Sequence, residues 1–260
     1  MLIDIVCQKI CHRPISQIRP REVLELLQEI EKTGRLETAR RAKTIIGGVF
    51  RLAALTDRAP TDPTVVLRNA TKAPKVTHRA AIIQPDRFGE LLRAIDGYEW
   101  GPSIKCALQA LALTFVRPGE LRQCMWKDID LEDGIWRIPA STTKMKRPLD
   151  VPITPQLRVI LREISPYSRK DSFVFPSPQS FYKPMGSHGL RAALIRLGFG
   201  EEMTAHGFRA SASSMLNELG YRPDVIEMQL GHIEKNDVRR EYNRALYWDE
   251  RVAMMSEWAK

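Results

Sequence analysis

The sequence predicts a mainly α-helical fold, with a small helical domain over residues 1–70 and a mixed α/β domain over residues 80–260 that contains one small antiparallel sheet. Apolar residues recur at helical spacing through most of the chain. Between residues 131 and 153, two short strand-like runs instead flank a polar turn. Residues 71–79 are polar and basic and contain a proline, so we take them as the linker between the domains.

Two helices are expected in the first domain. After Pro20, apolar residues recur at helical spacing and Gly34 follows as a stop signal, which predicts an amphipathic helix. A second helical pattern runs from about Leu36 to Leu55 and ends before residues 60–63, whose prolines and aspartate break it.

The composition favours a polyanionic partner. The chain has 40 Lys and Arg against 31 Asp and Glu, a formal net charge of +9, and the field of such a protein attracts nucleic acid. Arg40, Arg41 and Lys43 lie along the second helix and are candidates for contacts with DNA phosphates. The charge also fits an ordinary basic protein, and the three residues also fit a solvated helix face.

The second domain is expected to be helical with one hairpin. Residues 84–94 and 103–115 have helical patterns, and the latter is apolar nearly all round, so we expect it to be buried. Residues 135–139 and 149–153 are expected to be strands joined by the lysine-rich turn 141–147. Further helical patterns lie at residues 156–164, 189–197, 206–219, 222–230 and 239–258.

Cysteine count and hydropathy exclude several classes of protein. The four cysteines are mostly far apart, which does not suggest a disulfide framework. Cys7, Cys11 and His12 lack a second ligand pair, so we expect neither a metal nor another cofactor. No apolar run is long enough to span a membrane, and the N-terminus lacks the order of a signal peptide. We therefore expect a soluble cytoplasmic protein without a membrane partner.

Two arginines are candidate ligands of a phosphodiester. Cleavage of this poor electrophile requires that its oxygens be neutralised in the transition state, and guanidinium groups can bind them bidentately. Arg117 precedes Pro118 at a helix start, with Glu120 in the first turn. Arg209 lies three residues after His206, so on a helix both could touch one phosphate. Taken singly, they also fit surface arginines and a capping histidine.

Four further residues complete the candidate set. His232 follows a glycine at which a helix can end. Lys144, in the turn between the strands, could donate a proton to a leaving oxygen, although Lys144 and Lys146 could equally be plain phosphate contacts. Tyr242 could be the nucleophile of a covalent phosphotyrosine, which keeps the energy of the broken bond for rejoining without ATP or metal. A lone tyrosine in such a helix is more often a packing residue.

The order of these residues resembles the tyrosine recombinases of the phage-integrase family. An arginine, a lysine-bearing hairpin, His-x-x-Arg, Gly-His and a tyrosine follow one another, and the resemblance covers about residues 79–260. The ending, residues 242–245 and 250–258, resembles the P4-type integrases of prophages and genomic islands. The resemblance implies a C-shaped clamp around duplex DNA, with a SAM-like core-binding domain over residues 1–70 and the catalytic domain over residues 80–260.

The resemblance also implies a role for each matching residue. Arg117 and Arg209 would clamp the scissile phosphate, and Glu120 would support the first arginine. His206 and His232 would complete the oxygen contacts and the proton handling.

The reaction and the partners follow from the same resemblance. Lys144 would be the general acid for the 5′-hydroxyl, and Tyr242 the nucleophile of a 3′-phosphotyrosyl link, in the integration or excision of a mobile element. The implied partners are double-stranded DNA attachment sites, a homotetramer that assembles on them from monomers, and accessory DNA-bending or excision factors, at the bacterial nucleoid. Cleavage within one protomer or by its neighbour stays open.

The N-terminus departs from the family pattern. Members of this type begin with an arm-binding domain, and their core-binding domain opens with a helix before a segment like residues 11–18. This chain starts almost at that segment, so the sequence suggests an N-terminally shortened protein with a partial core-binding domain. Two alternatives stay open, namely a type IB topoisomerase with similar chemistry and a DNA-binding remnant without recombination activity.

Overall fold

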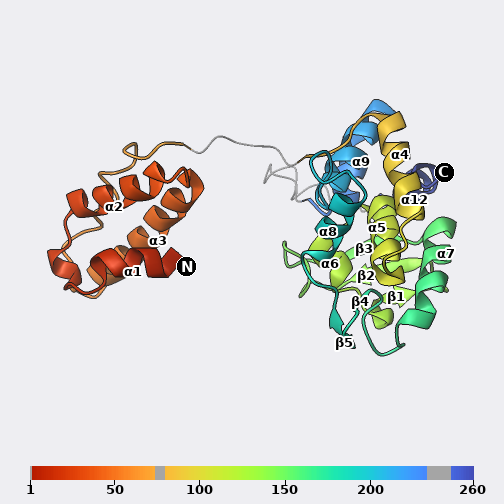
Figure 1. The fold of residues 1–260 in the computed structure, drawn as a ribbon, viewed down its shortest axis with the longest axis horizontal. Coiled ribbons are helices and arrows are strands. Elements are labelled where there is room, and N and C mark those ends of the chain that lie inside the picture. Colours follow the sequence, from red (N-terminus) through yellow and green to blue (C-terminus); the bar gives the residue numbers. More distant parts are fainter. Residues whose placement is uncertain (1, 74–79, 233–246) are drawn as a thin grey trace. The chain divides into compact units, whose positions relative to one another are not determined.

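The protein consists of two compact units, which are described separately. The computed structural model describes residues 2–73, 80–232 and 247–260, and the contacts of the chain divide it into residues 1–77 and 78–260 (Figure 1). No helix in these described ranges is long and apolar enough to cross a membrane.

Three helices build the N-terminal unit. They are α1 (Leu2–Ile10), α2 (Pro20–Lys32) and α3 (Leu36–Leu55), with one 3-10 turn between α1 and α2. The apolar face of α2, including Val23 and Leu27, packs against Ile46 and Phe50 of α3, and both expected helices are confirmed.

Helix α1 corrects the sequence-based expectation that the chain begins almost at residue 11, without an opening helix. Its nine residues are too few for a periodic pattern to stand out, and an isolated helix of this length is unstable in water. Val6 and Ile10 are buried in the same core as α3, so tertiary packing stabilises the helix. A helix therefore precedes residues 11–18 in this chain.

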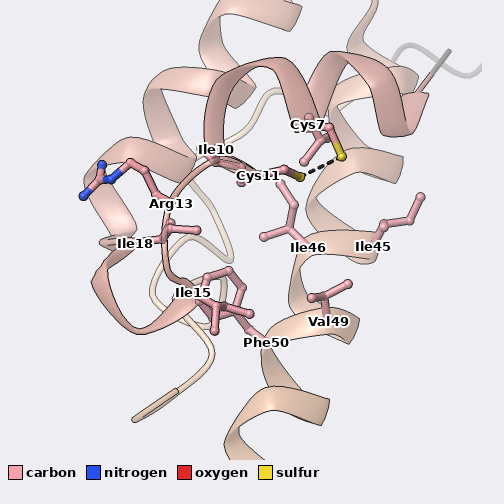
Figure 2. Close-up of a pocket in the computed structure, with 11 residues that line it drawn as sticks. Cys7, Ile10, Cys11, Arg13, Ile15, Ile18, Ile45, Ile46, Val49 and Phe50 are labelled. Atoms are coloured by element: carbon pink, nitrogen blue, oxygen red, sulfur yellow. Dashed lines mark hydrogen bonds between the residues drawn. The ribbon is translucent and has the colours of Figure 1, made fainter. Parts of the chain in front are cut away.

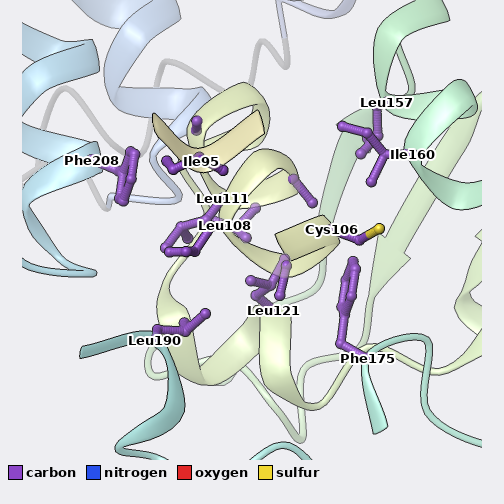
Figure 3. Close-up of a cluster of buried hydrophobic side chains, with 14 of the residues drawn as sticks. Ile95, Cys106, Leu108, Leu111, Leu121, Leu157, Ile160, Phe175, Leu190 and Phe208 are labelled. Carbon is purple, nitrogen blue, oxygen red and sulfur yellow. The ribbon is translucent and has the colours of Figure 1, made fainter. Parts of the chain in front are cut away.

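The C-terminal unit is built around one buried helix. Helix α5 (Pro102–Thr114) contacts α4 (Pro85–Asp96), α6 (Pro118–Arg122), α7 (Pro155–Ile164) and α8 (Gly189–Arg196). Figure 3 shows its side chains Cys106, Leu108 and Leu111 within the apolar core. The expected burial of this helix is confirmed, because most residues from Cys106 to Thr114 are buried and none of the helix is exposed.

The described residues confirm the expected mainly helical fold with a small antiparallel sheet, and they add a second small sheet that was not expected. The first has the order β1 (Ile129–Asp130), β2 (Ile135–Ile138) and β3 (Leu149–Pro152), which confirms the predicted hairpin. The second pairs β4 (Pro176–Ser177) with β5 (Ser180–Pro184). Strands of two residues, such as β1 and β4, are too short to show the alternation on which strand prediction depends.

The last described helices form a second apolar cluster beside the main core. They are α9 (Gly207–Glu218), α10 (Pro223–Gln229) and α12 (Trp248–Trp258), and their buried side chains surround Phe115. The indole Nε1 of Trp258 donates to the carbonyl oxygen of Ala112, 2.9 Å away, and the Trp258 ring packs edge-on against Phe115. Helix α12 confirms the C-terminal part of the helix expected over residues 239–258, whereas residues 239–246 lie outside the described ranges.

Candidate active site

The turn after α5 delivers the first arginine. Phe115 is fully buried and has a left-handed backbone, with φ of 40°, which is uncommon for a bulky residue and redirects the chain into α6. Arg117 is the N-cap of α6 and precedes Pro118, as the sequence predicts. The site therefore begins at a strained turn that the surrounding core holds in place.

A buried carboxylate holds Arg117. Glu120 is only 2% exposed, and its Oε1 accepts a hydrogen bond from Arg117 Nη1 at 2.8 Å. The other oxygen, Oε2, accepts from the backbone N–H of Arg117 at 2.9 Å. Both the backbone and the side chain of Arg117 are thus fixed by one residue, which restricts the rotamers of a long, flexible side chain.

Backbone carbonyls hold Arg209, on α9. The side chain is buried, and its Nη1 and Nη2 donate to the carbonyl oxygens of Phe115 and Leu230 at 2.8 and 2.7 Å. Burial, and next the positive charge of Arg117, lower the pKa of Arg209 to about 10, so the group remains charged at neutral pH. Neutral oxygens therefore fix this cation without cancelling its charge.

Gly231 brings the segment after α10 against Arg117. The Gly231 carbonyl accepts from Arg117 Nη2 at 3.1 Å, and the residue has φ of +61°. A Cβ atom at this position would lie 3.1 Å from Leu149 Cδ2 and 3.5 Å from Arg117 Nη1. Both the backbone conformation and the lack of space favour glycine here.

His232 completes the cluster in a defined tautomer. Its Nε2 lies 3.1 Å from Arg209 Nη2, and its Nδ1 lies 2.7 Å from Glu227 Oε2. A guanidinium can only donate, so Nε2 must accept from Arg209, and the ring proton must lie on Nδ1, where it donates to Glu227. The imidazole is therefore oriented by one residue on each side.

The other candidate residues lie at the start of α9, in the turn between β2 and β3, and in the segment that follows His232. His206 is the exposed N-cap residue of α9, and its carbonyl accepts from the Arg209 N–H at 3.2 Å. Lys144 and Lys146 are exposed in the turn between β2 and β3, and Lys146 has φ of 52°. Tyr242 lies outside the described residues.

Helix α12, which follows residue 242, carries a buried cation without a role in the sequence-based expectation. Arg251 is 2% exposed, and its Nε and Nη2 donate to Gln229 Oε1 at 3.0 and 2.8 Å. Its Nη2 also donates to the backbone oxygen of Asp150 on β3. Arg251 thus ties α12 to α10, which leads to His232, and to the strand that follows the lysine turn.

The roles of Glu227 and Arg251 in orienting their neighbours have no direct signal in the sequence. Glu227 looks like any surface carboxylate on a helix, and it acquires its role only because α10 ends so that His232 folds back onto it. Arg251 lies in the segment on which the family resemblance was partly based, and a cation between apolar helical positions was the available hint.

The cations proposed for DNA contacts in the N-terminal unit have other partners. Arg40 and Arg41 are exposed and donate to the same carboxylate, Glu37, at distances from 2.9 to 3.1 Å. The Nζ of Lys43 donates to two backbone oxygens and one hydroxyl of residues 67–71, at 3.1 to 3.3 Å. Their DNA-binding role stays a prediction, and Lys43 also has a structural one.

The cluster can bind an oxyanion. Two guanidinium groups, a histidine and the carbonyls that hold them come from three segments of the chain, around residues 115–117, 209 and 230–232. The positive charge of Arg117 contributes to the lowered pKa of Arg209. Two neighbouring cations are most stable when an anion lies between them. Within the described ranges, no group of three or more His, Cys, Asp or Glu could hold a metal ion.

Each of the two units matches a model of a known protein family. Residues 82–247 match the model of the phage integrase family, and residues 1–70 match that of the phage integrase central domain. The chain is 36% identical to prophage integrase IntA of Escherichia coli (strain K12) over 94% of this chain and 59% of the relative. It is 30% identical to the integrase of Enterobacteria phage P4 over 94% of this chain and 59% of the relative. The chain thus spans about three fifths of the length of these relatives.

Two solved structures have a similar fold. A lambda integrase tetramer bound to a Holliday junction has a TM-score of 0.71 at 16% identity, over 91% of this chain and 70% of that one. The Tn1549 transposon integrase in complex with a circular intermediate DNA has a TM-score of 0.72 at 17% identity, over 98% of this chain and 90% of that one.

Proposed function

We propose that this chain, which belongs to the phage integrase family, is a site-specific DNA recombinase that cleaves and rejoins strands through a 3′-phosphotyrosyl intermediate. One observation carries the proposal. Arg117, Arg209 and His232 meet through hydrogen bonds, although they come from three separate segments of the family-matched region.

The arginines would bind the non-bridging oxygens of the scissile phosphate. Arg117 is already oriented by Glu120, and Arg209 by the carbonyls of Phe115 and Leu230, so neither has to be ordered during the reaction. Groups that are fixed before charge develops stabilise a transition state more effectively than mobile ones. His232 Nε2, now an acceptor from Arg209, would handle a proton at the same phosphate, with His206 at the N-terminus of α9 as a further contact.

Tyr242 would attack the phosphorus, and Lys144 would protonate the departing 5′-hydroxyl. The exposed turn between β2 and β3 leaves Lys144 able to approach bound DNA, and Lys146 would contact a phosphate. We place Glu227 among the positioning residues, because it fixes the ring of His232.

The partners we propose are double-stranded attachment sites and three further copies of the chain. Support for a tetramer comes from the similar fold of a lambda integrase tetramer on a Holliday junction. Arg40 and Arg41 would contribute phosphate contacts from the N-terminal unit. A protein with this activity works where its target DNA lies, so we also infer association with the bacterial nucleoid and exchange with accessory DNA-bending or excision factors.

A nicked suicide duplex tests the proposal. The duplex should carry the native attachment site, taken from the DNA that flanks the gene, and a nick that lets the cleaved fragment diffuse away. We expect a covalent protein–DNA adduct that resists denaturant and is absent from Tyr242→Phe, which cannot supply the nucleophilic oxygen.

The controls separate the proposed activity from its rivals. Tyr242→Phe should bind the duplex as the parent protein does, because the change removes only one hydroxyl. Binding without an adduct at the attachment site would contradict the proposal and indicate a DNA-binding module. Relaxation of supercoiled plasmids that lack the site would indicate a topoisomerase instead.

A further inference from the structure

Two cysteines of the N-terminal unit lie against each other beside an apolar cavity. Cys7 lies on α1, and Cys11 is the first residue after this helix. The two Sγ atoms are 2.7 Å apart and are joined by the dashed line in Figure 2. Both line a cavity of about 320 Å³ whose other walls are mostly isoleucine and valine side chains of α1, the loop after it and α3. Cys11 is exposed to solvent, and Cys7 is half-buried.

The backbone around the pair is compatible with a covalent link. The N–H of Cys11 donates to the carbonyl of Cys7 at 3.2 Å, so the two residues span one helical turn. Residues four apart on a helix have Cα atoms about 6 Å apart, which lies within the range that disulfides span. The two sulfur atoms already face each other, so only a small side-chain rotation separates the dithiol from a disulfide.

The other two thiols of the chain provide an internal contrast. Cys106 and Cys124 are fully buried in the core of the C-terminal unit. Burial raises the pKa of the Cys106 thiol to about 12 and that of Cys124 well above its usual range. The hydrogen bond with Cys7 also raises the pKa of Cys11, to about 11, so Cys11 differs from these two thiols in exposure and not in the direction of its pKa. Neither solvent nor a small oxidant reaches Cys106 or Cys124 readily, so these two thiols should remain reduced in the folded protein.

We propose that Cys7 and Cys11 form a dithiol modification site that a peroxide closes to an intramolecular disulfide. One thiol attacks a peroxide oxygen, the O–O bond breaks, and a sulfenic acid and one water form. The second thiol attacks the sulfenic sulfur, the S–O bond breaks, and the S–S bond and a second water form. The peroxide is reduced by the two electrons that the thiols lose, and thiol exchange with a reductant reverses the link.

Peptide mapping tests this directly, because trypsin cuts after Lys9, between the two cysteines. The Arg13–Pro14 and Arg19–Pro20 bonds resist trypsin, so the cysteines fall on residues 1–9 and 10–21. After brief treatment of the whole protein with hydrogen peroxide, and then blocking of free thiols in denaturant, we expect these two peptides to be linked without reductant and separate with it. Cys106 and Cys124 should carry the blocking group.

A non-reducing gel distinguishes the source of the link. The linked peptides should come from the monomer band, and a disulfide that joins two copies would overturn the proposal. Oxidation of Cys11 only to sulfinic or sulfonic acid, with Cys7 free, would overturn it as well. The result does not depend on DNA cleavage, so it stands or falls apart from the recombinase proposal.

Phenylarsine oxide supplies a second readout that needs no oxidant. This reagent bridges two adjacent thiols, so we expect one equivalent to bind to the folded protein. Cys7→Ser and Cys11→Ser should each weaken binding at least about 100-fold, because the second thiol acts as an intramolecular ligand. Cys11→Ser changes an exposed residue and should fold normally; unchanged arsenical binding in either variant would show that the pair is not the site.

Discussion

Two pairs of arginines, one pair in each unit, are held in opposite ways. In the N-terminal unit, Arg40 and Arg41 are 61% and 71% exposed and share a carboxylate one turn away on the same helix. In the C-terminal unit, Arg209 and Arg251 are 8% and 2% exposed and donate mainly to backbone and amide oxygens from distant segments. Exposed cations are mobile and screened, whereas buried ones are rigid and keep their field. A residue that stabilises the negative charge of a transition state should be a buried, rigid cation.

The largest expected effect comes from breaking this arrangement at Arg209. Arg209→Lys keeps the charge but cannot reach both the Phe115 and Leu230 carbonyls while presenting a planar fork to a phosphate. We expect the rate of covalent adduct formation on the suicide duplex to fall by about 10³-fold, with DNA affinity much less changed. Arg87→Lys, at a partly exposed arginine of α4 that is paired with Glu202, is the matched control and should leave the rate unchanged. Equal losses of binding and cleavage would make Arg209 an affinity contact.

Lys144 differs from both groups of arginines, because it is an exposed cation to which we assign a chemical step. Lys144→Ala should slow cleavage by about 10²-fold. A substrate with sulfur in place of the 5′-bridging oxygen should restore the rate, because a thiolate leaves without a proton. Lys146→Ala is the neighbouring control. If the sulfur substrate restores the cleavage rate of Lys146→Ala and not that of Lys144→Ala, Lys146 and not Lys144 is the general acid.

A substitution of Arg251 tests whether this buried cation holds α12 against the rest of the C-terminal unit. Arg251→Met leaves Gln229 Oε1 and the Asp150 carbonyl without their donor, which should lower the free energy of unfolding by about 2 kcal/mol. Hydrogen exchange should accelerate first in α12. A uniform loss of protection over the C-terminal unit would indicate that Arg251 supports the whole core instead.

The smallest effect is expected where the cations are exposed, and it depends on pH. Hydrogen bonds from Arg40 and Arg41 lower the pKa of Glu37 to about 2, below the value of about 4.3 in an unfolded chain. The pair therefore stabilises the fold above the unfolded pKa, and this contribution disappears as pH falls through the folded one. At pH 7, Glu37→Gln should have nearly the same thermal midpoint as the parent protein. Between pH of about 4.5 and 2, the midpoint of the variant should vary less with pH than that of the parent protein.

The fold was largely predictable because its signals are local. The positions of α2, α3, α5 and the β2–β3 hairpin follow from apolar periodicity and from proline and glycine signals within each segment. Helix α1 and the second sheet were missed because they are too short to carry a pattern and depend on neighbours for stability.

The site was predictable only in part, because its geometry depends on distant segments. Residue order predicted that Arg117, Arg209 and His232 belong to one site, and the structure brings them together. The carbonyls that hold Arg209 belong to Phe115 and Leu230, whose apolar side chains give no sign of this contact. Likewise, nothing in a sequence distinguishes the Glu227 that orients a histidine from a solvated carboxylate. The proposed roles of these residues await the kinetic tests above.

Lys146, in the turn between β2 and β3, has a left-handed backbone that a substitution could relax. A lysine with positive φ costs roughly 1 kcal/mol more than glycine would, so Lys146→Gly should let the turn close more readily and raise the thermal midpoint slightly. The same change removes a charge from an exposed tip. If Lys146→Gly has a higher thermal midpoint and a weaker affinity for duplex DNA, the strained backbone at residue 146 has been retained because the lysine contributes to DNA binding.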